Sequence, residues 1–494
     1  MNCKYFGKCG SCTLHSMSYE EQLSFKVKRE KERFSSIWKN NMDIIKSDDG
    51  AFRNRAEFRV FHKLGKIDYA MSDIDKKLLT IDSCSMVSLD IALIMDKLLD
   101  EVKDNEILSK KFFSVEFLGI SCNEVQLSFV TPIELWNKSE RADTMGKEML
   151  RISDRHENEF VLSPTNEEAM VEVAKNRVKS YKDLPVNLYQ INTKFRDEAR
   201  PRYGLLRGRE FLMKDGYSFH ASKEDMIREF DLMEVTYKKI FTRLGLDFRV
   251  VDADSGAIGG TGSKEFHVLA NSGEDTILVC EDCDYGANIE TIYTDEKEVD
   301  EVNELTYEQL QEKEVTAKCS CGGKLSFKKG IEVGHIFQLG DKYSLALEAM
   351  FSNENGKPQA FEMATFGIGV SRLVASVIEQ NHDENGCIWT KSTTPYMVDV
   401  IVSNAKKEDE LNAATKIYDA LKDANISTIL DDRKEKKHTY GFKMGDFKLI
   451  GFPYAVVVGK LLKDGLVEIV NRKTLEKQEV EIDKVVETLV ELNS

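Results

Sequence analysis

The chain has 494 residues, of which 41% are hydrophobic and 31% are charged, a composition typical of a folded protein with several buried cores. Its net charge of −16 at pH 7 excludes a protein that coats nucleic acid indiscriminately, although one basic face can still bind RNA. The sequence has no apolar run long enough for a membrane span and no apolar signal core at its start, so we expect a cytoplasmic protein without membrane contact.

A group of cysteines lies at the amino end. Cys3, Cys9 and Cys12 have a C-x5-C-x2-C spacing, and Gly10 between the last two lets the backbone wrap closely around a ligand. Thiolates in such groups hold iron–sulfur clusters, usually with a fourth cysteine from elsewhere, and Cys84 is the best candidate. Four thiolates also suit zinc, and free thiols are the remaining alternative. The spacing leaves the metal open.

Residues 17–62 predict a helix and then a basic strand. Residues 17–38 place apolar side chains near one helical face and most basic side chains outside it. In the strand, Arg53, Arg55 and Arg59 share one face, because side chains alternate between the two faces. That face either contacts RNA or forms a solvated edge.

The amino-terminal stretches CKYFGKCGSC, FRNRAEFRVFH and TIDSCSM resemble the N-terminal part of tRNA/rRNA (uracil-5-)-methyltransferases. The resemblance covers residues 1 to about 120. It implies a [4Fe–4S] cluster on the four cysteines and RNA contacts by the three arginines. The methyl-donor domain of that family does not follow, so we expect no methylation by this chain alone.

The stretch from Val161 to His220 carries the strongest functional signal. Residues 187–198 alternate apolar and polar side chains and predict a strand, a turn with Pro201 and two glycines follows, and residues 209–219 predict the returning strand. The hairpin gathers four side chains: Arg196, Glu198, Arg207 and Phe211. Each guanidinium group can bind two phosphate oxygens at once through parallel hydrogen bonds. The Phe211 ring can stack on a base, and the Glu198 carboxylate can accept a hydrogen bond from an exocyclic amine. We therefore predict a nucleotide site without a glycine-rich phosphate loop.

Three motifs in order carry a second resemblance. FRDE with RGREFLMKD resembles motif 2 of class II aminoacyl-tRNA synthetases, and GIGVSRL resembles motif 3. PTNEEA, with Thr165 and Glu167, is similar to the T-x-E loop of prolyl-tRNA synthetases. From about residue 123 onward the chain thus resembles the bacterial-type prolyl-tRNA synthetases. The implied fold is multidomain α+β and α/β: a small α+β segment at 1–122, an antiparallel-sheet catalytic domain at 123–393 and a mixed α/β anticodon-binding domain at 394–494.

The resemblance implies ATP-dependent ligation of proline to tRNA(Pro) through a prolyl-adenylate, with Mg²⁺ bridging the phosphates. Arg196 is expected to hold the α-phosphate and Arg372 the γ-phosphate, while Thr165 and Glu167 bind the proline nitrogen. The other implied site residues are Glu198, Arg207, Phe211 and Glu332 for ATP, and His335 for proline. A buried core histidine is the alternative for His335. The alternative function is an RNA-binding iron–sulfur protein with an inactive synthetase-like body.

Two cysteine pairs, Cys280/Cys283 and Cys319/Cys321, bracket a polar insert at about 280–325. Thiolate pairs on two hairpin turns suit a zinc ribbon, with reduced free thiols as the alternative. The insert is too short for the large editing insertion of the bacterial enzymes, so we expect no editing in cis.

The long helix of class II motif 1, which forms much of the dimer interface in that family, is also missing. Only a strand-like tail, Val125 to Trp136, remains, and the sequence leaves open whether the implied homodimer forms.

From about Thr394 strands and helices alternate, which predicts a βαβ-type mixed sheet. With LDDRKE and IGFPYAVVVGK, this part resembles the anticodon-binding domain of class IIa synthetases. The resemblance implies that Arg433, Lys434 and Lys443 contact the tRNA, where unpaired bases are read.

Overall fold

The computed structural model describes residues 3–5, 8–10, 14, 17–34, 55–63, 66–87, 91–92, 94–95, 97–99, 114–118, 122–253, 256, 258–289, 293, 296–313, 315 and 318–493. The chain divides into two compact units, Met1–Cys122 and Asn123–Ser494. Each unit has a buried hydrophobic core of its own. Among the described residues, no helix combines the length and the apolar character needed to cross a bilayer.

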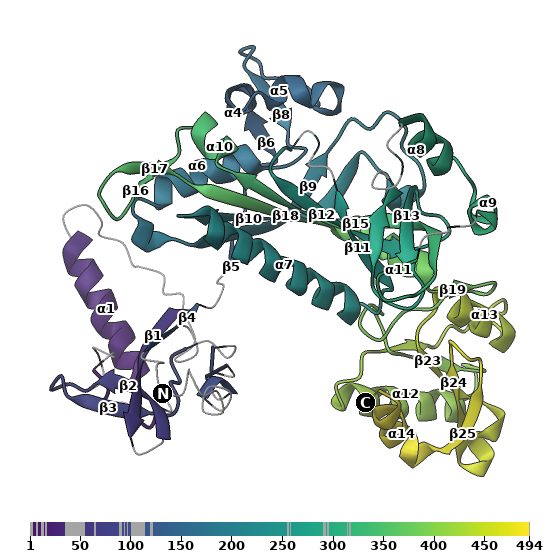
Figure 1. Ribbon diagram of the computed structural model, residues 1–494. Helices are drawn as coiled ribbons and strands as arrows, with labels where there is room; N and C mark the ends of the chain where they lie inside the picture. Colours follow the sequence, from purple (N-terminus) through teal and green to yellow (C-terminus); the bar gives the residue numbers. More distant parts are fainter. Residues whose placement is uncertain are drawn as a thin grey trace. The chain divides into compact units, whose positions relative to one another are not determined.

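The amino-terminal unit contains a four-stranded antiparallel sheet and the helix α1 (Tyr19–Phe34), as Figure 1 shows. Acidic residues in the first turn of α1 complement the positive end of the helix dipole. The sheet order is β3-β2-β1-β4, with β1 (Arg55–Lys63), β2 (Lys66–Ser72), β3 (Leu78–Ile81) and β4 (Ser114–Leu118). Phe58, Tyr69 and Ile81 bury one face of it. The predicted basic strand is confirmed as β1.

A nine-stranded sheet forms the centre of the second unit (Figure 1). Its main order is β11-β12-β15-β18-β10-β9-β5, and β13 pairs with β15 and β14. From β11 to β9 every neighbouring pair is antiparallel. The strands are β5 (Cys122–Glu124), β9 (Val186–Phe195), β10 (Glu210–His220), β11 (Phe248–Ala253), β12 (Gly262–Leu269), β13 (Asp275–Cys280), β14 (Gly286–Asn288), β15 (Leu325–Gly340) and β18 (Glu362–Gly369). The predicted hairpin is confirmed as β9 and β10.

Helix α7 (Lys223–Arg243) lies along this sheet and supplies much of its core. The Ser222 side chain accepts a hydrogen bond from the Asp225 backbone N–H, which caps the start of the helix. Phe230, Tyr237 and Phe241 are buried against the sheet. Each buried ring of this size contributes roughly 1.5–3 kcal/mol. The sheet that carries the polar site is therefore held rigidly from one side.

The segment from Val125 to Trp136 is not the strand that the sequence suggests. The structure has only the short strand β6 (Val130–Pro132), followed by helix α4 (Ile133–Lys138). Pro132 stands at the N-cap of α4, because proline lacks the N–H that a strand ladder needs and suits a helix start. Helix α5 (Arg141–Thr144) and the strands β7 (Arg151–Ser153) and β8 (Glu159–Leu162) follow.

The carboxy-terminal domain contains a mixed sheet, as predicted. It has five strands in the order β22-β21-β23-β24-β25. Strands β21 and β23 are parallel and buried throughout, which explains their continuous apolar sequences. The stretch before β23 is helical up to Ile450 rather than extended, and Gly451 ends the helix with φ 90°. The elements are β21 (Val398–Val402), α12 (Glu408–Asp423), β22 (Thr428–Asp431), α13 (Tyr440–Ile450), β23 (Tyr454–Val458), β24 (Leu466–Asn471), β25 (Lys477–Glu481) and α14 (Val485–Asn493).

The insert between β14 and β15 carries two short helices, α8 (Glu296–Asn303) and α9 (Tyr307–Glu312). The insert has a small core of its own, which includes Cys280, Cys319 and Leu325.

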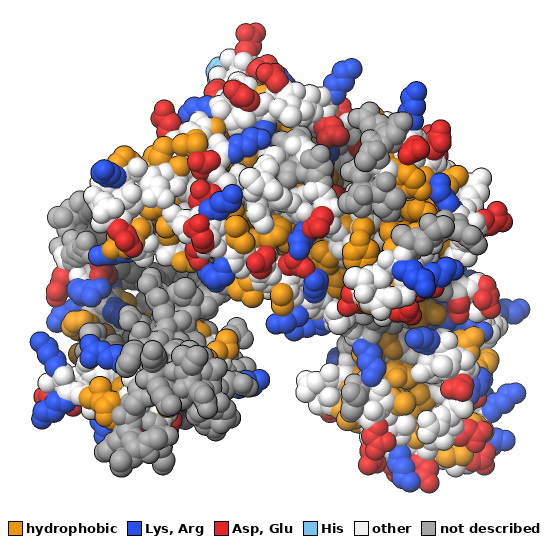
Figure 2. All heavy atoms as spheres, viewed as in Figure 1, with side chains coloured by type: hydrophobic (Ala, Val, Ile, Leu, Met, Phe, Trp, Pro, Cys, Tyr) orange, Lys and Arg blue, Asp and Glu red, His pale blue; other side chains and the backbone are white. Residues whose placement is uncertain are grey.

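In the view of Figure 2, basic side chains are interspersed with acidic ones over the described surface. The acidic residues outnumber the basic ones in the sequence, which gives the net charge of −16.

Candidate active site

A cavity of about 510 Å³ opens over the nine-stranded sheet. Its walls come from the β9–β10 hairpin, from β15, from the start of α11 (Val370–Gln380) and from the loop before α6 (Glu167–Arg177). Arg196 and Arg372, 176 positions apart in the sequence, both line it, and so do Thr165 and Glu167. The volume lies within the usual range for a site that encloses small molecules.

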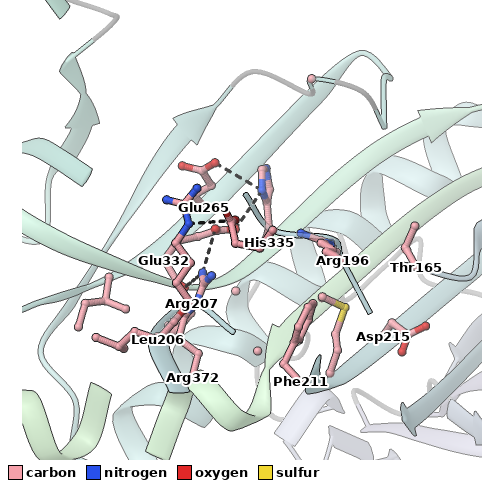
Figure 3. Close-up of a pocket in the computed structure, with 18 of the residues that line it drawn as sticks. Thr165, Arg196, Leu206, Arg207, Phe211, Asp215, Glu265, Glu332, His335 and Arg372 are labelled. Carbon is pink, nitrogen blue, oxygen red and sulfur yellow. Dashed lines mark hydrogen bonds and ion pairs between the residues drawn. The ribbon is translucent and has the colours of Figure 1, made fainter. Parts of the chain in front are cut away.

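Arg196 stands at the end of β9. Its backbone N–H donates to the Arg209 carbonyl at 2.9 Å, which fixes the hairpin there. The guanidinium carbon lies 5.5 Å from the centre of the Phe211 ring (Figure 3). Its Nε is buried and lacks a hydrogen-bond partner among the described residues. Burial lowers the pKa of Arg196, but a guanidinium still keeps its charge at neutral pH. Arg196 lines the cavity, so its guanidinium places a positive charge at the cavity wall.

Arg372 lies in the first turn of α11 and is held from two sides. Its Nη1 donates to the Glu332 carbonyl at 2.6 Å and lies 3.2 Å from the Glu332 carboxylate. Its Nε donates to the Leu206 carbonyl at 2.9 Å. Burial of Glu332 raises its pKa, but the His335 hydrogen bond and the Arg372 charge outweigh this and leave the pKa far below its usual range. Glu332 is therefore ionised and orients the guanidinium.

His335 belongs to the cavity wall. Its Nδ1 lies 3.4 Å from Glu265 and 3.3 Å from Glu332, as Figure 3 shows. The ring stacks on Phe337 with 3.8 Å between ring centres, and the side chain is 17% exposed. This exposure and the place in the cavity wall distinguish His335 from a core histidine.

The loop with Thr165 and Glu167 is fixed by a buried arginine. The Thr165 hydroxyl donates to Glu167 at 2.8 Å. Arg141 is only 1% exposed, and its Nη1 donates to Glu167 at 2.8 Å and to Glu168 at 3.2 Å. Its guanidinium lies 5.1 Å from the Trp136 ring centre. Sequence reasoning missed Arg141, since RADT carries no motif or spacing that marks it.

A second buried ion pair also escaped the sequence reading. Lys194 on β9 and Asp215 on β10 lie 2.8 Å apart. The Tyr217 hydroxyl donates to Asp215 at 2.8 Å and accepts from the Asn166 N–H at 3.0 Å. Burial lowers the pKa of Lys194, and the Asp215 charge opposes that effect. The pair connects the floor of the cavity to the loop that carries Thr165.

Glu198 and Arg207 line the cavity but bind each other. The Arg207 Nε lies 3.0 Å from the Glu198 carboxylate, and its Nη1 donates to Glu274 at 2.6 Å. A backbone hydrogen bond from Arg200, together with Arg207, lowers the pKa of Glu198. Sequence reasoning did not find Glu274, which also accepts from Arg202 at 2.6 Å.

The four cysteines of the insert come together. Their sulfurs all lie within 4.8 Å of one another, with 3.5 Å between Cys280 and Cys321 and 3.7 Å between Cys283 and Cys319. The Gly323 N–H donates to the Cys321 sulfur at 3.4 Å. A Cβ on Gly323 would lie 2.7 Å from the Cys280 sulfur, so the turn requires glycine. Zinc with four bonds of about 2.3 Å places its sulfurs about 3.8 Å apart, which fits this group.

The amino-terminal cysteine and arginine predictions are only partly within the described residues. Cys12 and Arg53 lie outside them, and Arg55 begins β1. Arg59 is exposed on β1. The remaining three predicted cluster ligands are half-buried free thiols: Cys3, Cys9 and Cys84. The iron–sulfur cluster and the RNA contacts stay predictions.

In the carboxy-terminal domain the three residues predicted to contact tRNA differ in their exposure. Lys434 is exposed. Arg433 is partly exposed and lies 2.7 Å from both Asp431 and Asp446. Lys443 is only 1% exposed, and its Nζ donates to the carbonyls of Val402 and Asp431, each at 2.9 Å. The prediction that Lys443 contacts RNA is therefore wrong, because its ammonium closes backbone hydrogen bonds inside the domain.

Three family models match the chain. The tRNA synthetase class II core domain (G, H, P, S and T) matches residues 150–381, and an anticodon binding domain matches residues 397–492. A tRNA (uracil-5-)-methyltransferase model matches residues 18–198. The first two agree with the class II core and the mixed carboxy-terminal sheet seen in the structure.

Curated relatives and solved structures point the same way. The chain is 69% identical to the proline–tRNA ligase of Sulfurimonas denitrificans over 371 residues, which cover 75% of this chain and 85% of that protein. It is 49% identical to the proline–tRNA ligase of Aliarcobacter butzleri, with 75% and 88% covered. The fold is similar to that of the Cryptosporidium parvum prolyl-tRNA synthetase complexed with halofuginone and AMPPNP, with a TM-score of 0.58 at 16% identity, over 75% of this chain and 65% of that one.

Proposed function

The chain belongs to the proline–tRNA ligase family, and we propose that the cavity of Arg196, Arg372 and the Thr165–Glu167 loop is where it activates proline with ATP before transfer to tRNA(Pro). One observation carries the proposal. Two arginines from distant motifs and the loop expected to bind the imino acid line a single cavity. A cavity of about 510 Å³ has room for a bent nucleotide and a small amino acid together.

The reaction needs charge stabilisation more than a protein base. The carboxylate of proline attacks the α-phosphorus of ATP in line, and pyrophosphate leaves. The guanidinium of Arg196 lines the cavity and supplies positive charge where negative charge develops on the α-phosphate. Arg372, held by Glu332, faces the other end of the triphosphate. Phe211, beside Arg196, supplies the stacking face for adenine.

The proline nitrogen is assigned to Thr165 and Glu167. Arg141 is shared between Glu167 and Glu168, so it compensates only part of their negative charge. Of the two carboxylates, Glu167 is the one that lines the cavity, so we assign the cationic amine to it. A carboxylate next to a secondary ammonium forms a strong charge-assisted hydrogen bond. His335, which also lines the cavity, is assigned to the proline pocket.

The nucleotide is expected to carry Mg²⁺. Glu265 and Glu332 line the cavity on the side of Arg372 and provide the oxygen atoms that Mg²⁺ prefers. Mg²⁺ neutralises phosphate charge when it is bound.

We also propose that Zn²⁺ occupies the four-cysteine group of the insert. The support is the sulfur geometry, the N–H donated to a sulfur and the glycine that the turn requires. Purified full-length protein is expected to contain one zinc per chain by elemental analysis. A chain without zinc after purification in zinc-containing buffer would contradict this.

We assign the tRNA contact to the carboxy-terminal domain, and the exposure of Lys434 there supports this. Because the substrates are tRNA and ATP, we assign the protein to the cytoplasm. The homodimer remains a prediction from the resemblance.

Proline-dependent exchange of pyrophosphate into ATP tests the proposed function. Arg196→Ala is expected to lower kcat/KM by about 10²–10³, the usual effect of one donor to developing charge. The matched control is Arg209→Ala, because Arg209 lies on the same hairpin but its side chain is 51% exposed and outside the cavity wall. It should stay within a few-fold of wild type. Equal rates for wild type and Arg196→Ala would refute the assignment.

A further inference from the structure

Strands β13 and β15 connect the four-cysteine group with the cavity. Their antiparallel register pairs Cys280 with Leu325 at the cysteine end and Asp275 with Gly330 at the other end. Asp275 and Gly330 both line the cavity. Five steps of about 3.4 Å separate the two ends, so they lie ~17 Å apart.

At the cavity end, this strand pair holds the motif 2 turn. Glu274, directly before β13, accepts hydrogen bonds from Arg207 and from Arg202, each at 2.6 Å. Both arginines belong to the turn between β9 and β10, whose residues form one wall of the cavity. A Cβ on Gly273 would meet backbone atoms of Gly330 at 2.4 Å, so β15 approaches the start of β13 closely. Displacing β13 therefore displaces the anchor of that turn.

A second connection starts at Asp275. His267 is buried, with its Nδ1 3.7 Å from Asp275 and its Nε2 2.9 Å from Glu265. Glu265 in turn lies 3.4 Å from His335. The chain of charged contacts continues from His335 through Glu332 to Arg372.

The cysteine end depends on a small core. That core buries Leu278, Phe327 and a few further apolar side chains together with Cys280 and Cys319, so two of the four thiols belong to it. A core of this size contributes little stability by itself, and small folded segments usually need a metal or a disulfide. A metal bound by all four sulfurs joins the turn after β13 to the turn before β15.

We propose that the metal in the four-cysteine group positions residues for ATP binding, because it fixes the β13–β15 pair that holds Glu274 and Asp275 at the cavity. This proposal rests on the zinc occupancy proposed for the same cysteines. The reacting atoms lie at the other end of the strands, so the metal acts through Glu274 on Arg207 and not on the substrate.

The test uses the full-length chain with Cys283→Ser and Cys321→Ser combined, the two thiols outside the buried set. The matched control is Cys387→Ser, which changes a half-buried thiol outside the group. Zinc content is measured by elemental analysis, and the KM for ATP and the KM for proline are measured by pyrophosphate exchange. We expect zinc to be lost, the ATP KM to rise about tenfold and the proline KM to change less than twofold.

Glu274→Gln supplies an independent variant that leaves the thiols intact. It should retain zinc and raise the ATP KM to a similar extent, and combining it with the cysteine changes should add little. Zinc loss with an unchanged ATP KM would overturn the positioning role and leave the zinc site standing. Wild-type protein without zinc would overturn the zinc site as well. An equal rise in both KM values, or a wild-type ATP KM in Glu274→Gln, would also overturn the positioning role.

Discussion

Replacing Arg141 with methionine probes how the buried guanidinium sets the charge of the proline site. Arg141 is 1% exposed and lies 2.8 Å from Glu167 and 3.2 Å from Glu168. Removing one partner of such a buried pair typically costs about 3–5 kcal/mol, because the remaining charges lose their compensation. Two buried carboxylates without a bridging cation share one proton at neutral pH. Glu167 then presents a partly neutral acid to the cationic amine of proline.

We expect Arg141→Met to raise the KM for proline about 100-fold at pH 7 and to leave the KM for ATP nearly unchanged. A factor of 100 corresponds to about 2.7 kcal/mol, within the cost of the broken pair. The proline KM should fall again as the pH rises, since the shared proton is then lost. Arg141→Lys keeps the positive charge but not the guanidinium geometry, in which Nη1 donates to both carboxylates, so its proline KM should rise only several-fold.

The assay is pyrophosphate exchange at varied proline and pH, with thermal unfolding of each variant as the control for folding. A general loss of structure would raise both KM values together and would show no recovery at high pH. A proline KM of Arg141→Met equal to that of wild type at pH 7 would refute the reasoning.

Three further changes test the carboxy-terminal domain. Lys434→Ala should raise the KM for tRNA a few-fold without lowering the melting temperature. Lys443→Met should lower the melting temperature, because it leaves two buried carbonyls without their donor. Aminoacylation at varied tRNA concentration and calorimetry distinguish the two effects. Burial and the nearby Asp431 charge raise the pKa of Asp399 from its ordinary 3.8 to about 7. Since the folded-state pKa is the higher one, this carboxyl favours folding at acid pH, and that contribution, up to about 4 kcal/mol, is lost as the pH rises from about 4 to 7. Asp399→Asn should therefore flatten the pH dependence of unfolding over that range, and an unchanged pH profile would contradict the assignment.

The sequence predicts the parts of the site that belong to local patterns. The alternation of residues 187–198 and the returning strand specify the β9–β10 hairpin, and Arg196 and Phe211 follow from it. The glycine-containing end of β18 specifies the start of α11 and thus Arg372. In each case the residues that define the element are neighbours in the chain.

The parts that escaped prediction depend on tertiary burial. Arg141 and Lys443 are charged residues in polar stretches, where a solvated position is the usual outcome. Both are buried because carboxylates or carbonyls from distant segments satisfy their donors. Glu274 was missed for a similar reason, since its partners lie 67 and 72 positions earlier in the chain. Pro132, by contrast, is a signal present in the sequence itself. It marks the start of α4, and the strand-like interpretation of Val125 to Trp136 did not use it.

The most direct measurement is a crystal structure of the chain with proline and a non-hydrolysable ATP analogue. The account predicts an α-phosphate oxygen within hydrogen-bond distance of Arg196, the γ-phosphate beside Arg372, and the proline nitrogen between Thr165 and Glu167. A triphosphate that lies outside this cavity, or that contacts only one of the two arginines, would contradict it.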